Sequence, residues 1–183
     1  MNQSGVNRIV AWVLAVGGAI GLVASFVLTI EKIALLKDPF YIPTCSINPV
    51  LSCGSVMKTA QAEVFGFPNP LLGIVGFAVV TTVGVLLVAG VSLPSWVWIG
   101  LQVGVTFGVL FVHWLIVQSL YEIRALCPYC MVVWAVTIPI FWYVTLRNIR
   151  PAFQWHSVVL VLWYLVIAGG VLQAFWFYWS SLV

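Results

Sequence analysis

The sequence predicts an all-α integral membrane protein. Of its 183 residues, 63% are hydrophobic and only 6% are charged, whereas a soluble domain carries roughly 25% charged residues. The apolar residues fall into five stretches of about 20 residues, the length that crosses the hydrocarbon core of a bilayer. The net charge of +3 is spread along the chain without a run of Lys or Arg, which argues against a nucleic-acid-binding surface.

The first predicted span covers residues 9–30, which contain no charged residue. It is longer than the apolar region of a signal peptide and only Arg8 precedes it, so an uncleaved helix is favoured over a cleaved signal peptide. Gly17 and Gly21 are four residues apart and predict close contact with a neighbouring helix. The other predicted spans are residues 71–91, 96–118, 125–146 and 157–179.

The third span carries Gly100, Gly104 and Gly108 at a spacing of four residues. A helix face without side chains predicts a groove for a neighbouring helix. His113 is the one His or charged residue within the predicted spans. Because it has no charged partner there, a packing role is favoured over a transport pathway.

Residues 31–70 form the one long polar connection, with five prolines and the first two of the four cysteines. Long ordered loops usually carry function. Within this loop, residues 55–65 predict a short helix, because Val56, Ala60 and Val64 recur every four residues. Such a helix lies either along the membrane surface or within the loop as an ordinary helical turn.

Five spans place the chain ends on opposite sides of the membrane and all four cysteines on one side. Lys and Arg number four on the cysteine side and three on the other, which does not decide the orientation. All four acidic residues also lie on the cysteine side, so Arg8, Arg147 and Arg150 are unopposed on the other. This balance favours cysteines outside the cytoplasm, since positive charge collects in cytoplasmic loops.

Cys127 and Cys130 form a Cys-x-x-Cys pair at the head of the fourth span. Positions i and i+3 share one helix face. Pro128 suits a first helical turn, which places Cys127 at the helix N-terminus, where the backbone dipole favours a thiolate. Cys130 then lies one turn deeper, toward the apolar side. The pattern predicts a redox centre at a membrane surface.

Cys45 and Cys53 make a second pair, separated by seven residues in the polar loop. Two pairs in series relay electrons by thiol–disulfide exchange, which needs only a thiolate and a reachable disulfide. A lipid-soluble quinone, able to take two electrons, is the natural acceptor. Three other interpretations stay open: structural zinc held by the four cysteines, a plain structural disulfide between Cys45 and Cys53, and a transporter or scaffold with incidental cysteines.

Three segments of the sequence carry a more specific pattern. They are Ser52-Cys53-Gly54-Ser55-Val56-Met57-Lys58-Thr59, Phe65-Gly66-Phe67-Pro68-Asn69-Pro70-Leu71-Leu72-Gly73 and Cys127-Pro128-Tyr129-Cys130. Together with the Cys-x7-Cys spacing, they resemble the vitamin K epoxide reductase family, and the resemblance runs from the first span to about Arg147. The chain looks like a bacterial member of the actinobacterial type, one that does the job of DsbB.

The resemblance implies a four-helix transmembrane bundle around a quinone site, followed here by a fifth transmembrane helix. It implies that Cys45 forms the mixed disulfide with a partner protein, that Cys53 passes electrons to Cys127, and that Cys130 reacts with the quinone. Many bacterial members carry a fused thioredoxin-like domain after the fifth helix. This chain ends at Val183, so the expected partner is a separate, DsbA-like protein of the thioredoxin fold.

The resemblance also places three residues at the quinone. Asn69 matches the family position that hydrogen-bonds a quinone oxygen, although beside two prolines it equally suits a turn. Thr59 stands where the family often has Ser, and it keeps the hydroxyl. Trp134 stands where some members, the vertebrate enzymes among them, have Tyr. Its indole N–H donates but cannot accept or ionise, so a role of the Tyr hydroxyl does not carry over.

We therefore expect a thiol oxidase of the cytoplasmic membrane that makes disulfides. A reduced thioredoxin-fold partner attacks the Cys45–Cys53 disulfide, electrons pass to Cys127 and Cys130, and menaquinone or ubiquinone accepts them. The alternatives are a quinone or quinone-epoxide reductase of the vitamin K type, and a non-catalytic membrane protein with structural zinc or a structural disulfide.

Overall fold

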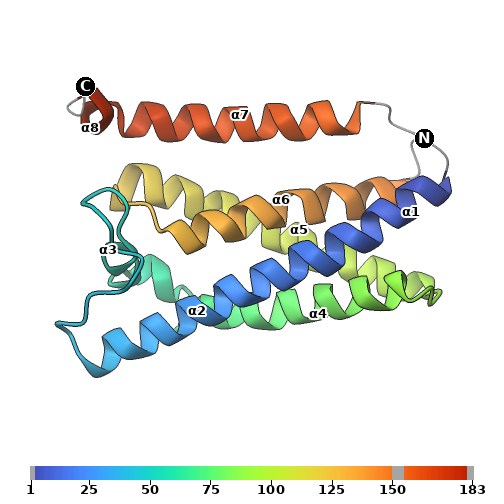
Figure 1. Cartoon of the computed structure of the whole chain (residues 1–183), viewed down its shortest axis with the longest axis horizontal. Helices are drawn as coiled ribbons and strands as arrows, with labels where there is room; N and C mark the ends of the chain where they lie inside the picture. Colours follow the sequence, from blue (N-terminus) through green and yellow to red (C-terminus); the bar gives the residue numbers. More distant parts are fainter. Residues whose placement is uncertain (1–2, 150–154, 181–183) are drawn as a thin grey trace.

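The computed structural model describes residues 3–149 and 155–180, so Arg150 lies outside the described part. Within that part the chain is helical, with short connections and one long loop (Figure 1). Five helical segments are long and apolar enough to cross a membrane, as the sequence predicts. They are Asn7–Lys37, Pro70–Val88, Ser95–Ile123, Pro128–Ile149 and His156–Ala174.

The first span is one long rod made of α1 (Gln3–Trp12), the π-helical turn η1 (Val13–Gly17) and α2 (Gly18–Lys37). It continues well past residue 30, where the uncharged stretch ends. Glu31 and Lys32 continue the helix because both are buried, at 6% exposed each, and both bind partners in the following loop. The polar loop therefore begins at residue 38, not at residue 31.

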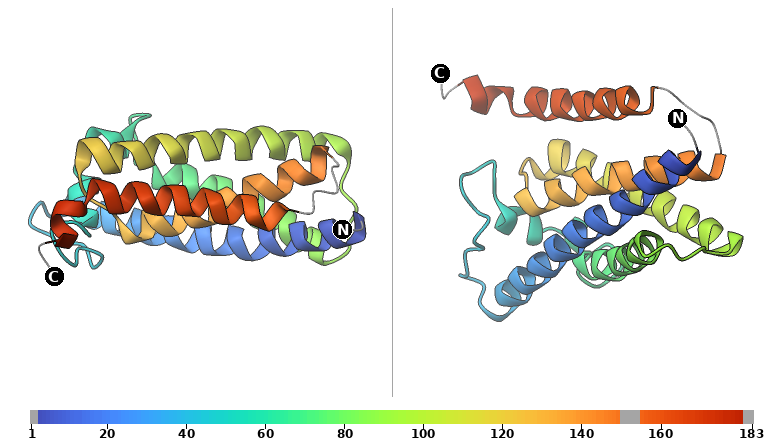
Figure 2. Two further views of the ribbon diagram at one scale, coloured as in Figure 1. Left: turned by 90° about the horizontal axis from the view of Figure 1, so that it is seen from above. Right: turned by 45° about the vertical axis from the view of Figure 1, so that its right-hand side comes forward.

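The remaining spans also differ from the predicted ranges by a few residues at their ends. They are α4 (Pro70–Val88), α5 (Ser95–Val117) extended by the π-helical η3 (Gln118–Ile123), α6 (Pro128–Ile149) and α7 (His156–Ala174), and α7 is followed by the short α8 (Trp176–Ser180). The first span packs with α4, α5 and α6 as a bundle, while α7 lies to one side of it (Figures 1 and 2). None of the residues of α7 is buried.

Small residues let the first span approach its neighbours closely. A Cβ at Gly21 would lie 2.5 Å from the Phe77 ring of α4, and a Cβ at Gly17 would lie 3.4 Å from Ile140 of α6. The helix contact predicted at these two glycines is therefore confirmed. Gly84 of α4 lies against the backbone of η1, where a Cβ would meet the Ala15 nitrogen at 2.2 Å.

The glycine face of α5 does not receive a helix, so that prediction is wrong. A Cβ added at Gly100 or Gly104 would meet nothing within 4 Å, and at Gly108 it would meet only Thr137 at 3.8 Å. All three glycines line a cavity between α5 and α4 instead. The spacing of the glycines cannot distinguish a helix contact from the wall of a cavity, because both need a face without side chains.

The loop holds two short helical pieces, α3 (Cys53–Met57) and the 3-10 turn η2 (Ala60–Glu63), not one helix over residues 55–65. The Ser52 hydroxyl caps α3 by accepting a hydrogen bond from the Ser55 N–H at 3.2 Å. Thr59 separates the two pieces with an extended backbone, and its hydroxyl donates to the Val56 carbonyl at 2.8 Å. Local bonding of this kind competes with a continuous helix.

Candidate functional site

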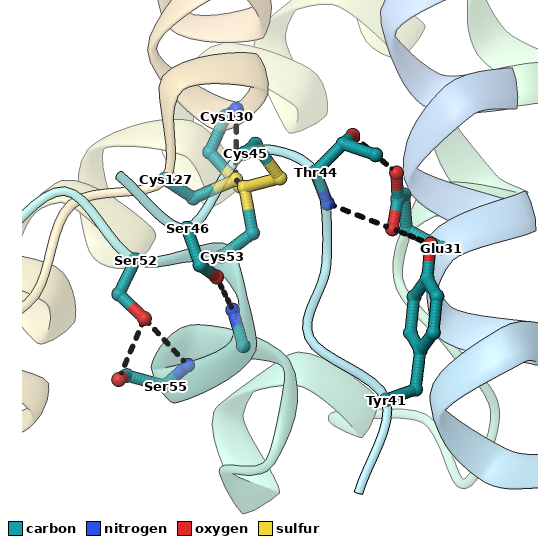
Figure 3. Close-up of a disulfide and its surroundings, with 11 residues drawn as sticks. Glu31, Tyr41, Thr44, Cys45, Ser46, Ser52, Cys53, Ser55, Cys127 and Cys130 are labelled. Atoms are coloured by element: carbon teal, nitrogen blue, oxygen red, sulfur yellow. Dashed lines mark hydrogen bonds between the residues drawn. A yellow bond between two sulfur atoms is a disulfide. The ribbon is translucent and has the colours of Figure 1, made fainter. Parts of the chain in front are cut away.

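Three of the four cysteine sulfurs meet where the loop covers the head of α6 (Figure 3). Cys45 and Cys53 form a disulfide with a Cα–Cα distance of 5.6 Å. The Cys127 Sγ lies 3.1 Å from the Cys53 Sγ, and the three sulfurs lie within 4.8 Å of one another. Cys127 and Cys130 are free thiols. A thiol thus stands in contact with a disulfide, the arrangement that thiol–disulfide exchange requires.

A short backbone bridge brings these two segments together. Leu51 and Leu126 pair as a parallel bridge, in which the Leu126 N–H donates to the Val50 carbonyl at 2.7 Å and the Ser52 N–H donates to the Leu126 carbonyl at 2.8 Å. Cys53 follows Leu51 by two residues and Cys127 follows Leu126 directly. The bridge therefore sets the contact between the two sulfurs.

The surroundings of Cys127 favour its thiolate. Cys127 directly precedes α6, and its Sγ accepts a hydrogen bond from the Cys130 N–H at 3.4 Å. The Cys130 thiol lowers the pKa of Cys127 by hydrogen bonding to it, and the backbone N–H groups of Cys130 and Tyr129 act in the same direction. Burial opposes them, but the net pKa is below the ordinary value. The helix-start position predicted from Pro128 accounts for the two backbone donors.

Cys130 lines a large apolar cavity inside the bundle, whereas the other three cysteines do not. The cavity has a volume of about 550 Å³ and runs between α4 and α5. This volume lies in the range of small-molecule sites, which are also mostly apolar with a few polar groups. Polar side chains on its wall include Lys32, Gln61, Asn69 and Thr137. The four cysteines are thus arranged in order from the loop to the cavity.

The three residues expected at a quinone lie in different places. Trp134 lines the cavity and is 5% exposed. Asn69 lines it too, but its amide is engaged with the loop: Nδ2 donates to the Gln61 carbonyl at 2.7 Å, and Oδ1 accepts from the Val64 N–H at 3.2 Å. Thr59 is not among the lining residues, and its hydroxyl is bonded to the Val56 carbonyl.

Glu31 holds the segment before Cys45 in place, a role that sequence analysis missed. Its carboxylate accepts hydrogen bonds from the Tyr41 hydroxyl at 3.0 Å, from the Thr44 N–H at 3.4 Å and from the Thr44 hydroxyl (Figure 3). The same carboxylate raises the pKa of Tyr41 by accepting its hydrogen bond. Because Thr44 directly precedes Cys45, Glu31 fixes the outer end of the disulfide.

Lys32 fixes the other side of the loop and was also missed. Its Nζ donates to the Met57 carbonyl at 2.6 Å, at the end of α3, and pairs with the Glu63 carboxylate at 2.9 Å. Within the described part of the chain, Lys32 is the one charged side chain that lines the cavity. The available signal was a pair of adjacent charges at the end of an apolar helix, where a buried charge needs a partner.

His113 has both ring nitrogens occupied. Its Nε2 accepts a hydrogen bond from the Trp163 indole N–H of α7 at 2.9 Å, so Nδ1 carries the proton and donates to the Val109 carbonyl at 2.7 Å. The Tyr164 hydroxyl donates to the Ala135 carbonyl of α6. These bonds attach α7 to α5 and α6, which fits the packing role expected for His113.

The sulfur cluster does not supply the ligands of a structural zinc site in this disulfide state. Such a site takes four ligands, and its cysteines bind as thiolates. The Cys45–Cys53 bond uses two of the three clustered sulfurs. Only Cys127 of these three is left as a free thiol.

The model of the vitamin K epoxide reductase family matches residues 12–145. The chain belongs to this family. The match covers α4 and α5, most of the first and fourth spans and all four cysteines, and it ends before α7. No curated protein matches the chain.

Members of the vitamin K epoxide reductase family are membrane oxidoreductases that generally exchange electrons with a quinone and work with thioredoxin-like partners. The family agrees with the arrangement of the site, in which a disulfide contacts the Cys127 thiol and Cys130 lines an apolar cavity. In this member, α3, η2 and the Leu51–Leu126 bridge bring the loop cysteines to Cys127.

Proposed function

We propose that this protein is a quinone-dependent thiol oxidase that makes disulfides in partner proteins. One observation carries the proposal: the Cys53 Sγ lies 3.1 Å from the Cys127 Sγ, while Cys130, one helical turn further, lines the apolar cavity. Electrons entering at the loop disulfide therefore have a route of sulfur contacts to the cavity.

The partner is a reduced dithiol protein of the thioredoxin fold. Its thiolate attacks Cys45, which is 6% exposed while Cys53 is fully buried, and Cys53 leaves as a thiolate. The partner's second thiolate releases Cys45, so the partner departs oxidised. Cys53 then attacks Cys127 in a Cys127–Cys130 disulfide, and Cys45 attacks Cys53. This re-forms the Cys45–Cys53 disulfide and leaves the inner pair reduced, the state that the structure shows.

The cavity suits a quinone with an apolar tail. Its wall is mainly apolar, and it continues along α4 and α5, where Gly76, Gly100 and Gly104 leave open space. A bound quinone supplies a two-electron acceptor that also takes up two protons. Cys130 faces this space as the electron donor, and Asn69, Trp134 and Lys32 are the candidate donors of hydrogen bonds to the ring oxygens. Thr59 then acts on the loop and not on the ring.

The cysteines face the outside of the cytoplasmic membrane in this proposal. Glu31, Asp38 and Glu63 lie at the cysteine end, whereas Arg8 and Arg147 lie at the opposite end. Lys and Arg collect on the cytoplasmic side, and in this chain acidic residues accompany them only at the cysteine end.

The test uses the full chain in detergent micelles or nanodiscs, with a reduced thioredoxin-fold protein and menaquinone. We expect partner thiols to be lost in step with quinone reduction, one disulfide per quinol. A parallel reaction replaces the quinone by its epoxide, with the same dithiol. Turnover of the epoxide near the quinone rate would favour a reductase of the vitamin K type, and no quinone-dependent loss of thiols would exclude the oxidase.

A further inference from the structure

A second cavity lies at the end of the bundle opposite the cysteines. It has a volume of about 540 Å³ and is enclosed by α1, by the connection between α4 and α5, and by the ends of α5 and α6. Polar groups on its wall come from Asn7, Arg8, Ser92 and Arg147. Neither the thiol relay nor the quinone cavity uses any of these residues.

Arg147 is held in this cavity with an incomplete set of hydrogen bonds. Its guanidinium carbon lies 4.8 Å from the ring centroid of Trp98, a cation–π contact that fixes the side chain across an aromatic face. Its Nε is buried and has no hydrogen-bond partner in the described part of the chain. A buried N–H group usually has a partner, and a guanidinium presents its donors in a fork that matches phosphate oxygens.

The charged side chains described on the wall of this cavity are all positive. Among the residues that the structure describes, Arg8 and Arg147 are the ionisable residues that line it, and no acidic side chain does. The four acidic residues of the chain are Glu31, Asp38, Glu63 and Glu122, all on the cysteine side of the bundle. The lining of the cavity therefore offers these two guanidinium groups no negative partner.

The depth of the cavity places it among lipid headgroups. Its walls are the ends of membrane spans: Arg8 is the second residue of the first, Val88 is the last of the second, and Arg147 lies two residues before the end of the fourth. Trp12 and Trp98 line it as well, and Trp concentrates at the interface of a membrane. Basic pockets between transmembrane helices bind anionic headgroups.

We propose that this cavity binds the phosphate group of an anionic phospholipid, held by Arg147 and Arg8. The acyl chains lie along the neighbouring spans, and the phosphate oxygens accept hydrogen bonds from N–H groups of the two guanidinium groups. The site is independent of the redox function proposed above.

The test measures lipid binding to the purified full chain by native mass spectrometry and by its thermal unfolding temperature. The lipids are phosphatidylglycerol and phosphatidylcholine, and inorganic phosphate is added in a separate arm. The variants are Arg147→Gln and Arg8→Gln. The matched control is Arg124→Gln, which removes one positive charge on the cysteine side, at an exposed residue.

We expect phosphatidylglycerol to bind preferentially and to raise the unfolding temperature of the wild type. Arg147→Gln should weaken this binding about tenfold, as for loss of a hydrogen bond to a charged group, and Arg124→Gln should leave it unchanged. Equal binding of phosphatidylcholine, or equal loss in the control, would overturn the site. Full stabilisation by inorganic phosphate alone would overturn the lipid assignment. If Arg147→Gln does not fold, Arg8→Gln gives the same comparison.

Discussion

The Sγ atoms of Cys53 and Cys127 lie 3.1 Å apart although 74 residues separate them in the chain. The contact joins a loop disulfide to a thiol at the head of a transmembrane helix, and it depends on the two backbone hydrogen bonds around Leu126. A structural disulfide alone does not need a third sulfur in contact. The proposed relay therefore rests on this contact.

Single cysteine substitutions should divide the relay into its two halves. Cys130→Ser should abolish quinone reduction, because the sulfur lining the cavity is lost. Cys45→Ser should block electrons from the partner protein and leave the reaction of the Cys127–Cys130 pair with quinone intact. The measurement is quinol formation, driven first by the partner and then by a small membrane-permeant dithiol. Equal partner-driven activity in wild type and the Cys45 variant would contradict the relay.

Removal of the Cys130 thiol should raise the pKa of Cys127. The hydrogen bond from Cys130 is the main cause of the lowered pKa, so Cys130→Ala should leave less thiolate at neutral pH. The pKa of Cys127 is lower in the folded chain than in the unfolded chain. The contribution of Cys127 to stability is therefore present above the unfolded-state pKa and is lost as the pH falls through the folded-state pKa. The midpoint of the Cys127 titration is measured from the thiolate absorbance between alkaline and neutral pH. Cys130→Ser, which keeps a donor, is the control.

Glu31→Gln should loosen the segment before Cys45. Its three hydrogen bonds to Tyr41 and Thr44 lose the negative charge of the acceptor, and hydrogen bonds to a neutral group are weaker than those to a charged one. We expect dithiothreitol to reduce the Cys45–Cys53 disulfide faster in this variant than in the wild type. The measurement is mass mapping of the alkylated cysteines. An unchanged rate would remove Glu31 from this role.

The same contact makes the loop sensitive to alkaline pH. Glu31 raises the pKa of Tyr41, so the stability from this bond is fully present below the unfolded pKa and is lost as the pH rises through the folded one. Disulfide reduction in the wild type should accelerate over that alkaline range. The acceleration should be smaller in Tyr41→Phe, where only ionisation of the reducing thiol remains, and an equal acceleration in the two proteins would contradict a role of Tyr41.

Lys32→Met should weaken the interactions that keep α3 in position. It removes a bond to the Met57 carbonyl and the pair with Glu63. Because Glu63 is 38% exposed, we expect a loss of only about 1–3 kcal/mol in the free energy of unfolding. The position of α3 is measured in a protein that also carries Cys45→Ala and Cys130→Ala. In that protein, formation of a Cys53–Cys127 disulfide shows that α3 holds Cys53 beside Cys127. Undiminished trapping and stability would show that Lys32 does not position it.

Filling the open face of α5 should discriminate between quinones by their tails. Gly104 lines the cavity with nothing within 4 Å of an added Cβ, so Gly104→Leu should obstruct a long apolar tail. We expect the KM for a long-tailed menaquinone to rise about tenfold, or about 1.4 kcal/mol, with a smaller change for a tailless naphthoquinone. Gly169→Leu, at another open glycine on α7, is the control and should change neither value.

The positions of the spans and of the cysteines on them were predictable from the sequence. Apolar length determines which segments cross a membrane, and Cys127-Pro128 marks a helix start because Pro tolerates the first turn. The close contact at Gly17 and Gly21 was also predictable, because a residue without a side chain lets a neighbouring helix approach. These features follow from residue type and local spacing along the chain.

Other features were decided by tertiary structure. The glycines at 100, 104 and 108 carry the same spacing as a helix contact, yet α4 leaves them facing a cavity. Glu31 and Lys32 read as the start of a loop, but their partners at Thr44 and Met57 keep them helical and buried. The spacing of residues shows which contacts a helix face can make. Burial and charge pairing depend on which distant segment of the chain folds against that face. For that reason the sequence alone identified two cysteine pairs, and only the folded chain brought Cys53 into contact with Cys127.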